Sequence, residues 1–501
     1  MIDRGGMRRL FCTGAVAAAA GLSACTFGPN YRRPSAPVPA EYKEAQPQPG
    51  WKISQPSDMF NRGAWWSIYD DPVLDGLERR IDISNQNLKA AAAALAQSEQ
   101  LVAEARSGFF PTTDVNLAAQ RERPGGGLPI TSLFTDQVTA SWTPDFWGLI
   151  RREVEANIAN AQASAADLAS ARLSAQGTLA GDYLQLRIAD ELYRLLTRLS
   201  KDYAESLRIT KNQYAAGVAA QSDVSQAEAL WYSTQAQAVA TRLTRAQFEH
   251  AIAVLIGVPP ADLTIAPTDY YIQIPDVPPG LPSTLLERRP DIAAAERTMA
   301  LANAEIGVQV AAFYPTISLS LDAGTEAATI AKLFQASSGF WSVGANLVET
   351  VFEGGLRHAQ LQAAIAVFNE DLANYRQTVL TAFQQVEDEL AALRILAAEA
   401  KVQDDAVAAA REAVRVFNNQ YLAGTVAYTS VVVAEETELA DLETALTIRE
   451  NRLVASASLI QALGGGWYAG ELPSPAQVKA TAPLNFNPLP PRVPVQGQGP
   501  S

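Results

Sequence analysis

The chain has 501 residues, of which 48% are hydrophobic and 18% are charged, and its formal net charge is −14. This acidic balance disfavours nucleic-acid binding, because affinity for phosphate backbones comes from clustered Lys and Arg. Both cysteines, Cys12 and Cys25, lie in the first 25 residues, so the sequence that follows excludes disulfides, thiolate metal sites and cysteine nucleophiles.

The first 24 residues are typical of an export signal. Arg4, Arg8 and Arg9 form a basic start, and an apolar, Ala-rich run follows them. That run is too short to cross a membrane as a mature helix. Translation beginning at Met1 or at Met7 would preserve the signal, and the sequence leaves both starts open.

A lipidation motif ends this signal. The run Leu22, Ser23, Ala24, Cys25 resembles the bacterial lipobox, in which the cysteine is acylated with fatty acids such as palmitate and becomes the new N-terminus. Thr26 follows, and by resemblance to bacterial lipoproteins a residue other than Asp there implies sorting to the outer membrane. Ordinary cleavage near Ala24, with Cys25 left as a free thiol, is the alternative.

The chain after the cysteine begins with a proline-rich stretch. Residues 25–64 contain few apolar runs, which predicts an extended tether from the lipid to the body. Structure is expected to begin near Trp65. Apolar residues recur at helical spacing from Pro72, which predicts one helix that ends before Pro111, because a residue preceding proline disfavours the helical region.

Two pairs of alternating segments come next, at about 112–143 and at about 316–348. In each pair apolar residues alternate with small polar ones, as Ile317 and Leu319 do with Ser318. In an exported chain, alternation over about 9–10 residues predicts transmembrane β-strands. A soluble hairpin that packs on a helix shows the same alternation and is the alternative.

Two strand pairs cannot enclose a lumen within one chain. About eight strands are the practical minimum for a barrel, and open strand edges are not tolerated in lipid. If these segments span a membrane, other copies of the chain must complete the barrel. Two copies would supply about eight strands and three copies about twelve.

Each strand pair leads into a very long helix. Proline is absent from about 148–213 and from about 356–420, and a helix of that length would extend roughly 100 Å. The second of these helices carries heptad spacing interrupted by one four-residue step, which predicts coiled-coil contacts. Shorter return helices end at Gly257 and Gly464, where glycine suits a helix C-terminus.

The long helices belong to a duplicated unit. Asn212-Gln-Tyr-Ala-Ala-Gly217 returns as Asn419-Gln-Tyr-Leu-Ala-Gly424 at an offset of 207 residues, and Phe109-Phe-Pro111 returns as Phe313-Tyr-Pro315 at an offset of 204. A unit this long is not a solenoid repeat. We expect four parts: a first repeat at 65–257, a proline-rich linker at 258–282, a second repeat at 283–467, and a proline-rich, loosely ordered tail at 468–501.

Several separated motifs carry a resemblance to a known family. They are the opening of the second repeat, Leu281-Pro-Ser-Thr-Leu-Leu-Glu-Arg-Arg-Pro-Asp-Ile292, the run Cys25-Thr-Phe-Gly-Pro-Asn-Tyr-Arg-Arg-Pro34, and Trp65-Trp66 with Asp71-Pro72. In this order they resemble the outer-membrane efflux (TolC-like) family, in its lipoprotein OprM/NodT-type branch. The resemblance extends from the lipobox to about Trp467.

The resemblance implies a mixed, mainly α fold. Three chains would form a homotrimer whose twelve-stranded β-barrel, four strands per chain, sits in the outer membrane, and whose α-helical barrel crosses the periplasm. It also implies a passive duct for drugs or other small molecules. The duct would receive them from an inner-membrane pump, usually of the resistance-nodulation-division (RND) type, through a periplasmic adaptor protein.

The resemblance places the periplasmic mouth at two turns, about 215–222 and about 422–429, which contain Gly217 and Gly424. Each chain would supply both turns, so a trimer would carry six of them. The two copies differ in sequence after the glycine, and this difference points to where a gate would lie.

The gate residues also follow from the resemblance. Many relatives carry an Asp near the constriction in a Leu-Leu-Asp-Ala-Gln setting, whereas this chain has Val431-Val-Val-Ala-Glu435. Val433 thus replaces the Asp, and Thr429 and Val433 become candidates for an apolar gate. Asp223 in the first repeat remains an acidic candidate. Ordinary helix packing is the alternative for each of these residues.

Efflux has two alternatives, a structural lipoprotein and a protein-secretion duct. A structural coiled-coil lipoprotein without a pore is disfavoured by the alternating strands, and protein secretion within the same family is disfavoured by the lipobox and Glu287-Arg-Arg-Pro290. The sequence contains no Gly-x-Ser-x-Gly, phosphate-binding loop or His-rich metal spacing. We therefore expect no enzyme, cofactor or metal, and the acidic charge predicts a cation-selective lumen.

Overall fold

The computed structural model describes residues 26–44, 63–123, 126, 129–269, 271–277 and 282–487. The expected signal at 1–24, the lipobox residues Leu22, Ser23 and Ala24, and the lipidation site Cys25 lie outside the described residues.

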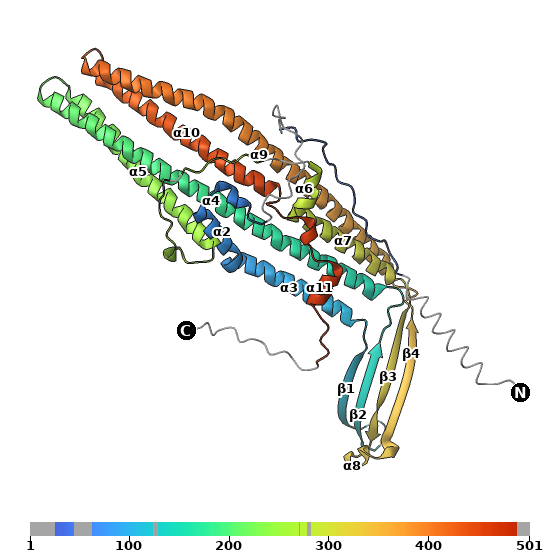
Figure 1. The fold of residues 1–501 in the computed structure, drawn as a ribbon. Helices are drawn as coiled ribbons and strands as arrows, with labels where there is room; N and C mark the ends of the chain where they lie inside the picture. The colour runs from blue at the N-terminus through green and yellow to red at the C-terminus, as the bar shows by residue number, and fades with distance from the viewer. Residues whose placement is uncertain are drawn as a thin grey trace.

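The described chain is an elongated, mainly helical body with a β-sheet at one end (Figure 1). Two long antiparallel hairpins point away from the sheet, and both end at the opposite extremity of the molecule (Figure 1). The first hairpin consists of α4 (Leu149–Ala215) and α5 (Gln221–Leu255), and the second consists of α9 (Leu356–Leu422) and α10 (Tyr428–Ala462).

Shorter helices pack beside the hairpins in the half nearer the sheet. α3 (Gln86–Ser107) lies along α4, and α7 (Pro290–Ala311) lies between α4 and α9. The remaining helical segments are η1 (Trp65–Tyr69), α2 (Pro72–Ser84), η2 (Pro260–Asp262), α6 (Pro282–Arg288), α8 (Ile330–Leu333), η3 (Ala336–Ser338), η4 (Ala469–Glu471) and α11 (Pro475–Thr481).

The helices repeat in length as the sequence repeats. α4 and α9 each have 67 residues, α5 and α10 each have 35, and α3 and α7 each have 22. The two halves therefore share one structural plan, which the sequence duplication indicates independently.

The sheet is antiparallel, with the strand order β1-β2-β3-β4. Its strands are β1 (Thr112–Glu122), β2 (Thr131–Trp142), β3 (Thr316–Ala327) and β4 (Gly339–Val348). β2 pairs with β3, so the two repeats meet in the middle of the sheet. Within the described sheet, β1 and β4 form the two edges.

The core near the middle of the molecule joins both hairpins to α2. Leu74, Leu184, Ile252 and Leu453 are almost fully buried there. A polar contact stabilises the same region: the Tyr183 hydroxyl donates a hydrogen bond of 2.6 Å to Asp71. Among the described residues, no helix is both long and apolar enough to cross a membrane.

The prediction of one unbroken helix from Pro72 to Pro111 is wrong. The chain breaks at Asn85, whose backbone is extended. Its side chain accepts a hydrogen bond from the Leu88 N–H at 3.0 Å and donates one to the Leu255 carbonyl at 2.7 Å. Asparagine is a favoured N-cap, so Asn85 ends α2, starts α3 and ties both to the end of α5.

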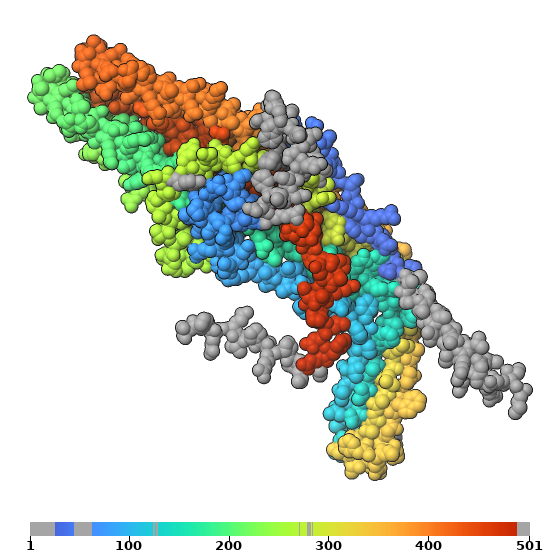
Figure 2. All heavy atoms as spheres, viewed as in Figure 1, coloured from blue at the N-terminus to red at the C-terminus, as the bar shows by residue number. Residues whose placement is uncertain are grey.

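The expectation of a loosely ordered tail is also wrong for its first part, which forms a packed helix. Ser474 caps α11, with its hydroxyl accepting from the Gln477 N–H at 3.3 Å, and Val478 is fully buried against α3 and α4. Figure 2 shows this segment in red, lying over α3 and the start of α4. Residues 488–501 lie outside the described part of the chain.

Residues 26–44, here called the N-terminal strap, pack along the helices and are bonded to them. No helix or strand forms within these residues. The Asn303 side chain donates to the Pro29 carbonyl at 3.0 Å, and the Glu387 carboxylate accepts from the N–H groups of Lys43 and Glu44 at 2.7 and 2.9 Å. This part of the expected tether is thus fixed on the body.

Candidate functional site: the helical tips and the sheet

The two hairpins end in the same kind of turn. Gly217 and Gly424 have φ values of 75° and 73°, a left-handed conformation that favours glycine. The Val218 N–H donates to the Gln213 carbonyl at 2.8 Å, and the Thr425 N–H donates to the Gln420 carbonyl at 3.0 Å. Both turns therefore carry the Schellman hydrogen bond that closes a helix C-terminus.

In the first tip, Asp223 caps a helix. It is the third residue of α5, and its carboxylate accepts from the Ala220 N–H at 3.2 Å. An acidic side chain in the first turn also interacts favourably with the helix dipole. The structure thus gives Asp223 a local structural contact at the tip.

In the second tip, Thr429 and Val433 lie four residues apart on α10, so they share one side of the helix. Thr429 is exposed, and its hydroxyl donates to the Gln226 side chain of α5 at 3.2 Å. Val433 is 56% exposed. These two candidates therefore form an exposed stripe beside a contact between the hairpins.

Sequence reasoning missed a buried acid next to this stripe. Glu435 is 5% exposed, and its Oε1 accepts from the Ser206 hydroxyl at 3.3 Å. The Tyr203 hydroxyl donates to its main-chain carbonyl at 3.2 Å. Within the described structure its Oε2 has no hydrogen-bond partner. The sequence feature that could have indicated this burial is the position of the carboxylate directly after the apolar run 431–434.

The two faces of the sheet differ in polarity. On one face Asp322 accepts hydrogen bonds from Gln137, Thr139 and Ser342 at 2.9, 3.0 and 3.0 Å. Asp114 pairs with Thr139 in the register, so it lies in the same row across the strands. A row of side chains from all four strands thus contains two acids, and its members from β2, β3 and β4 are joined by hydrogen bonds.

The opposite face is apolar and open to solvent in the single chain. Val115, Leu117, Trp341 and Val343 are 68, 75, 77 and 70% exposed. Asp136, which pairs with Leu117, interrupts this face. An exposed apolar face of this extent marks a surface that contacts lipid or protein.

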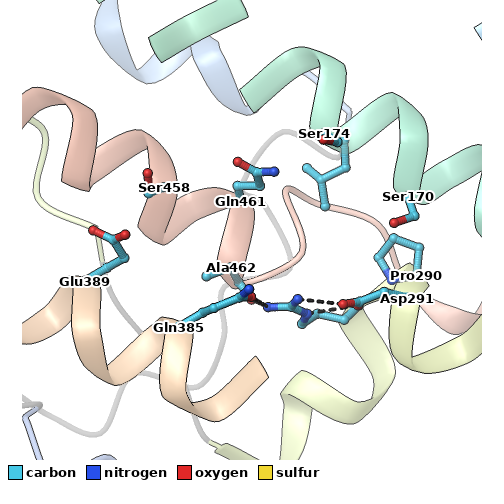
Figure 3. A pocket seen from close by; sticks show the side chains of 11 residues that line it. Ser170, Ser174, Pro290, Asp291, Gln385, Glu389, Ser458, Gln461 and Ala462 are labelled. Atoms are coloured by element: carbon cyan, nitrogen blue, oxygen red, sulfur yellow. Dashed lines mark hydrogen bonds and ion pairs between the residues drawn. The ribbon is translucent and has the colours of Figure 1, made fainter. Parts of the chain in front are cut away.

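A polar cavity of about 370 Å³ lies among α4, α7, α9 and α10 (Figure 3). Beside it the Arg289 guanidinium binds Asp291 at 2.6 Å, Gln385 at 2.8 Å and the Ala462 carbonyl at 3.0 Å. Arg289 and Asp291 of the motif at 281–292 thus join the start of α7 to α9 and the end of α10. Across the described ranges, no group of His, Cys, Asp and Glu could hold a metal ion.

Comparison with known proteins shows the same plan. The sequence profile of the outer membrane efflux protein family matches residues 79–258 and 281–465. The pyoverdine export outer membrane protein OpmQ of Pseudomonas aeruginosa is 31% identical over 450 residues, which cover 87% of this chain and 94% of OpmQ. The probable efflux pump outer membrane protein TtgC of Pseudomonas putida is 29% identical over 456 residues, covering 89% of this chain and 94% of TtgC.

A solved structure agrees with these sequence matches. The outer-membrane channel OprN is similar with a TM-score of 0.81 at 28% identity, over 88% of this chain and 100% of the OprN chain. The family profile matches the chain in two segments, one in each repeat. This chain belongs to the outer membrane efflux protein family.

Proposed function

We propose that this chain is the outer-membrane channel subunit of a tripartite efflux system. It would form a passive duct for drugs or other small molecules. The observation that carries the proposal is the sheet: an exposed apolar face, a polar face with an acidic row, and a direct connection to two long helical hairpins. Apolar outside and polar inside is the pattern of a transmembrane barrel strand.

A trimer accounts for the free edges of this sheet. β1 and β4 each have one unpaired side within the described chain, and an unpaired edge is not tolerated in lipid. Pairing β4 with β1 of the next copy closes a barrel. Eight strands leave an interior about filled by side chains, so three copies with about twelve strands suit a conducting lumen better than two.

The helical part would also be completed by neighbouring copies. α9 exposes Val367, Ile395, Val402 and Leu422 at 49, 53, 69 and 58%, more apolar surface than a solvated helix needs. In an α-helical barrel these side chains would contact the next chain. A helix of 67 residues extends about 100 Å, which suits a tube reaching deep into the periplasm.

The lipid anchor fits the same orientation. Cys25 itself lies outside the described residues, but the Phe27 N–H donates to the Trp147 carbonyl at 3.3 Å. The Phe27 ring stacks on Tyr314 at 4.2 Å. Trp147 and Tyr314 lie where the strands meet the helices. An acyl group on Cys25 would therefore start at the membrane boundary.

The tips would form the periplasmic mouth. There the turns at Gly217 and Gly424 would meet a periplasmic adaptor and, through it, an inner-membrane pump of the RND type. Thr429 and Val433 would line the constriction as an apolar gate, with Asp223 nearby. The exposure of Val433 and the position of Thr429 in the first turn of α10, next to the tip, support this assignment.

Export from cells tests the proposed function. The chain would be expressed with its adaptor and pump in cells that lack their own channel of this family, and accumulation of a fluorescent pump substrate would be measured. We expect the wild type to lower accumulation. Gly324→Val should abolish this effect, because a Cβ there would lie 2.1 Å from the Asp136 carbonyl and disrupt the β2–β3 pairing.

Gly339→Ala is the matched control in the same sheet, since its Cβ would make an ordinary contact of 3.6 Å. It should export like the wild type. Unchanged accumulation with the wild-type chain correctly located in the outer membrane would contradict the proposal.

A further inference from the structure

The two hairpins of one chain touch through few polar contacts near their tips. Gln226 accepts from Thr429, and Gln213 accepts from the Tyr421 hydroxyl at 2.5 Å. These contacts are neutral. The contacts between Glu435 and α4 differ because they involve a group that can change its charge.

Glu435 lies in apolar surroundings close to the mouth. It is the eighth residue of α10, about 10 Å from the start of that helix. Val431, Val432 and Leu439 of the same helix belong to the apolar cluster that joins all four long helices in this half of the molecule. Ionising a carboxyl group in such a place is unfavourable unless a cation accompanies it.

The charged groups around Glu435 do not supply that cation. Asp202 of α4 and Glu438 of α10 both act on Glu435 through their negative charge. Glu438 is itself paired, with Arg411 of α9 at 3.6 Å. No ion pair to Glu435 forms within the described residues. The other groups facing it are hydroxyls: Tyr203 and Ser206 of α4, and Tyr428 of its own helix.

The matching residue in the first repeat has the opposite environment. Glu228, at the offset of 207, pairs with Lys211 at 2.7 Å, and both side chains are partly exposed. The counterpart of Lys211 in the second repeat is Asn418. Both repeats thus contain the acid, but only the first contains the lysine. The acid of the second repeat lies against α4 of the other hairpin.

We propose that Glu435 is a protonation-dependent joint that fastens the two hairpins at the periplasmic mouth. Protonated Glu435 holds α10 against α4, and ionised Glu435 releases them, because separation lets water reach the carboxylate. The inference rests on the proposed function and adds regulation to it: opening of the mouth is favoured as pH rises.

The direction follows from linkage between ionisation and separation. Burial raises the pKa of Glu435 from its ordinary value of 4.5 to about 7 in the joined state. In the separated state the solvated carboxyl has its ordinary pKa. The ratio of separated to joined hairpins then rises about tenfold per pH unit between these two pKa values and stays constant above the higher one. The total increase is about 300-fold.

Single-channel recording at different pH values tests the joint. Wild-type protein in planar bilayers should show an open probability that rises from about pH 5 to about pH 7 and then stays level. Glu435→Gln keeps the shape and the hydrogen-bond acceptor but cannot ionise, so its low open probability should persist to high pH. Glu228→Gln, the matched control in the first repeat, should titrate like the wild type.

Two outcomes would contradict the proposed joint, and they differ in what they imply for the duct. The proposed joint would be wrong if the open probability depended on pH equally in the wild type and in Glu435→Gln, or did not depend on pH in the wild type. The proposed duct would still stand in either case. Absence of conductance in every variant at every pH would overturn the duct and the joint together.

Discussion

Arg152 fixes the start of the N-terminal strap through three hydrogen bonds. Its side chain is 2% exposed, and its guanidinium donates to the carbonyls of Phe27 and Gly28 at 3.1 and 3.2 Å and to the Asn30 side chain at 3.0 Å. Gly307 allows this approach, since a Cβ there would lie 2.7 Å from the Arg152 side chain.

Arg152→Ala should therefore release the strap. Hydrogen bonds from a charged donor contribute about 1.5–3 kcal/mol each, and removing one partner of a buried charged network costs about 3–5 kcal/mol. Because 1.4 kcal/mol corresponds to about a tenfold change in an equilibrium constant, the population with a free strap should rise roughly 10²- to 4 × 10³-fold. Arg152→Lys should give an intermediate release, since a single ammonium cannot reproduce the guanidinium fork.

Trypsin cleavage after Arg32 measures this population, because proteolysis of a transiently opened segment follows its equilibrium opening when cleavage is slow. Arg172→Ala is the control: Arg172 pairs with Asp82 on the surface, with both side chains about half exposed. Cleavage of Arg152→Ala at the same rate as the wild type and the control would refute the role assigned to Arg152.

Three further predictions concern the proposed lumen, the proposed gate and the core. Asp322→Asn should lower the preference for cations in reversal-potential measurements across asymmetric KCl, whereas Asp136→Asn on the opposite face of the sheet should leave it unchanged. Val433→Ala should raise single-channel conductance, and unchanged conductance and drug leakage would exclude Val433 from the gate. Burial raises the pKa of Glu78 from 4.5 to about 9. Between these values the folded chain binds a proton that the unfolded chain lacks, so the free energy of unfolding falls as pH rises through them. Glu78→Gln should remove this dependence and increase the free energy of unfolding near pH 8 by up to about 5 kcal/mol, and a thermal midpoint no higher than that of the wild type would contradict it.

The regular elements could be predicted because each depends on local spacing. The absence of proline indicated helices at about 148–213 and 356–420, and a heptad pattern supported the second. The structure has α4 and α9 at Leu149–Ala215 and Leu356–Leu422. Alternation of apolar and polar residues located the strands in the same way, since neighbouring side chains of a strand point to opposite faces.

The features that escaped prediction depend on distant partners. Helical spacing continues across Asn85, and the break there follows from a hydrogen bond to Leu255 in another helix. The strap is held by Arg152, more than 100 residues away along the chain. Glu435 is buried by α4 of the other repeat, and its contact with Ser206 spans 229 residues. Local patterns in one sequence carry no information about such pairs.

Conductance of the protein purified from outer membranes and placed in a planar bilayer, with no pump, adaptor or energy source present, tests the central claim most directly. A passive duct built from the acidic face of the sheet predicts stepwise channels with a cation preference, and these channels should persist without an ion gradient or nucleotide. Bilayers that contain the assembled protein and show no channels would contradict the account.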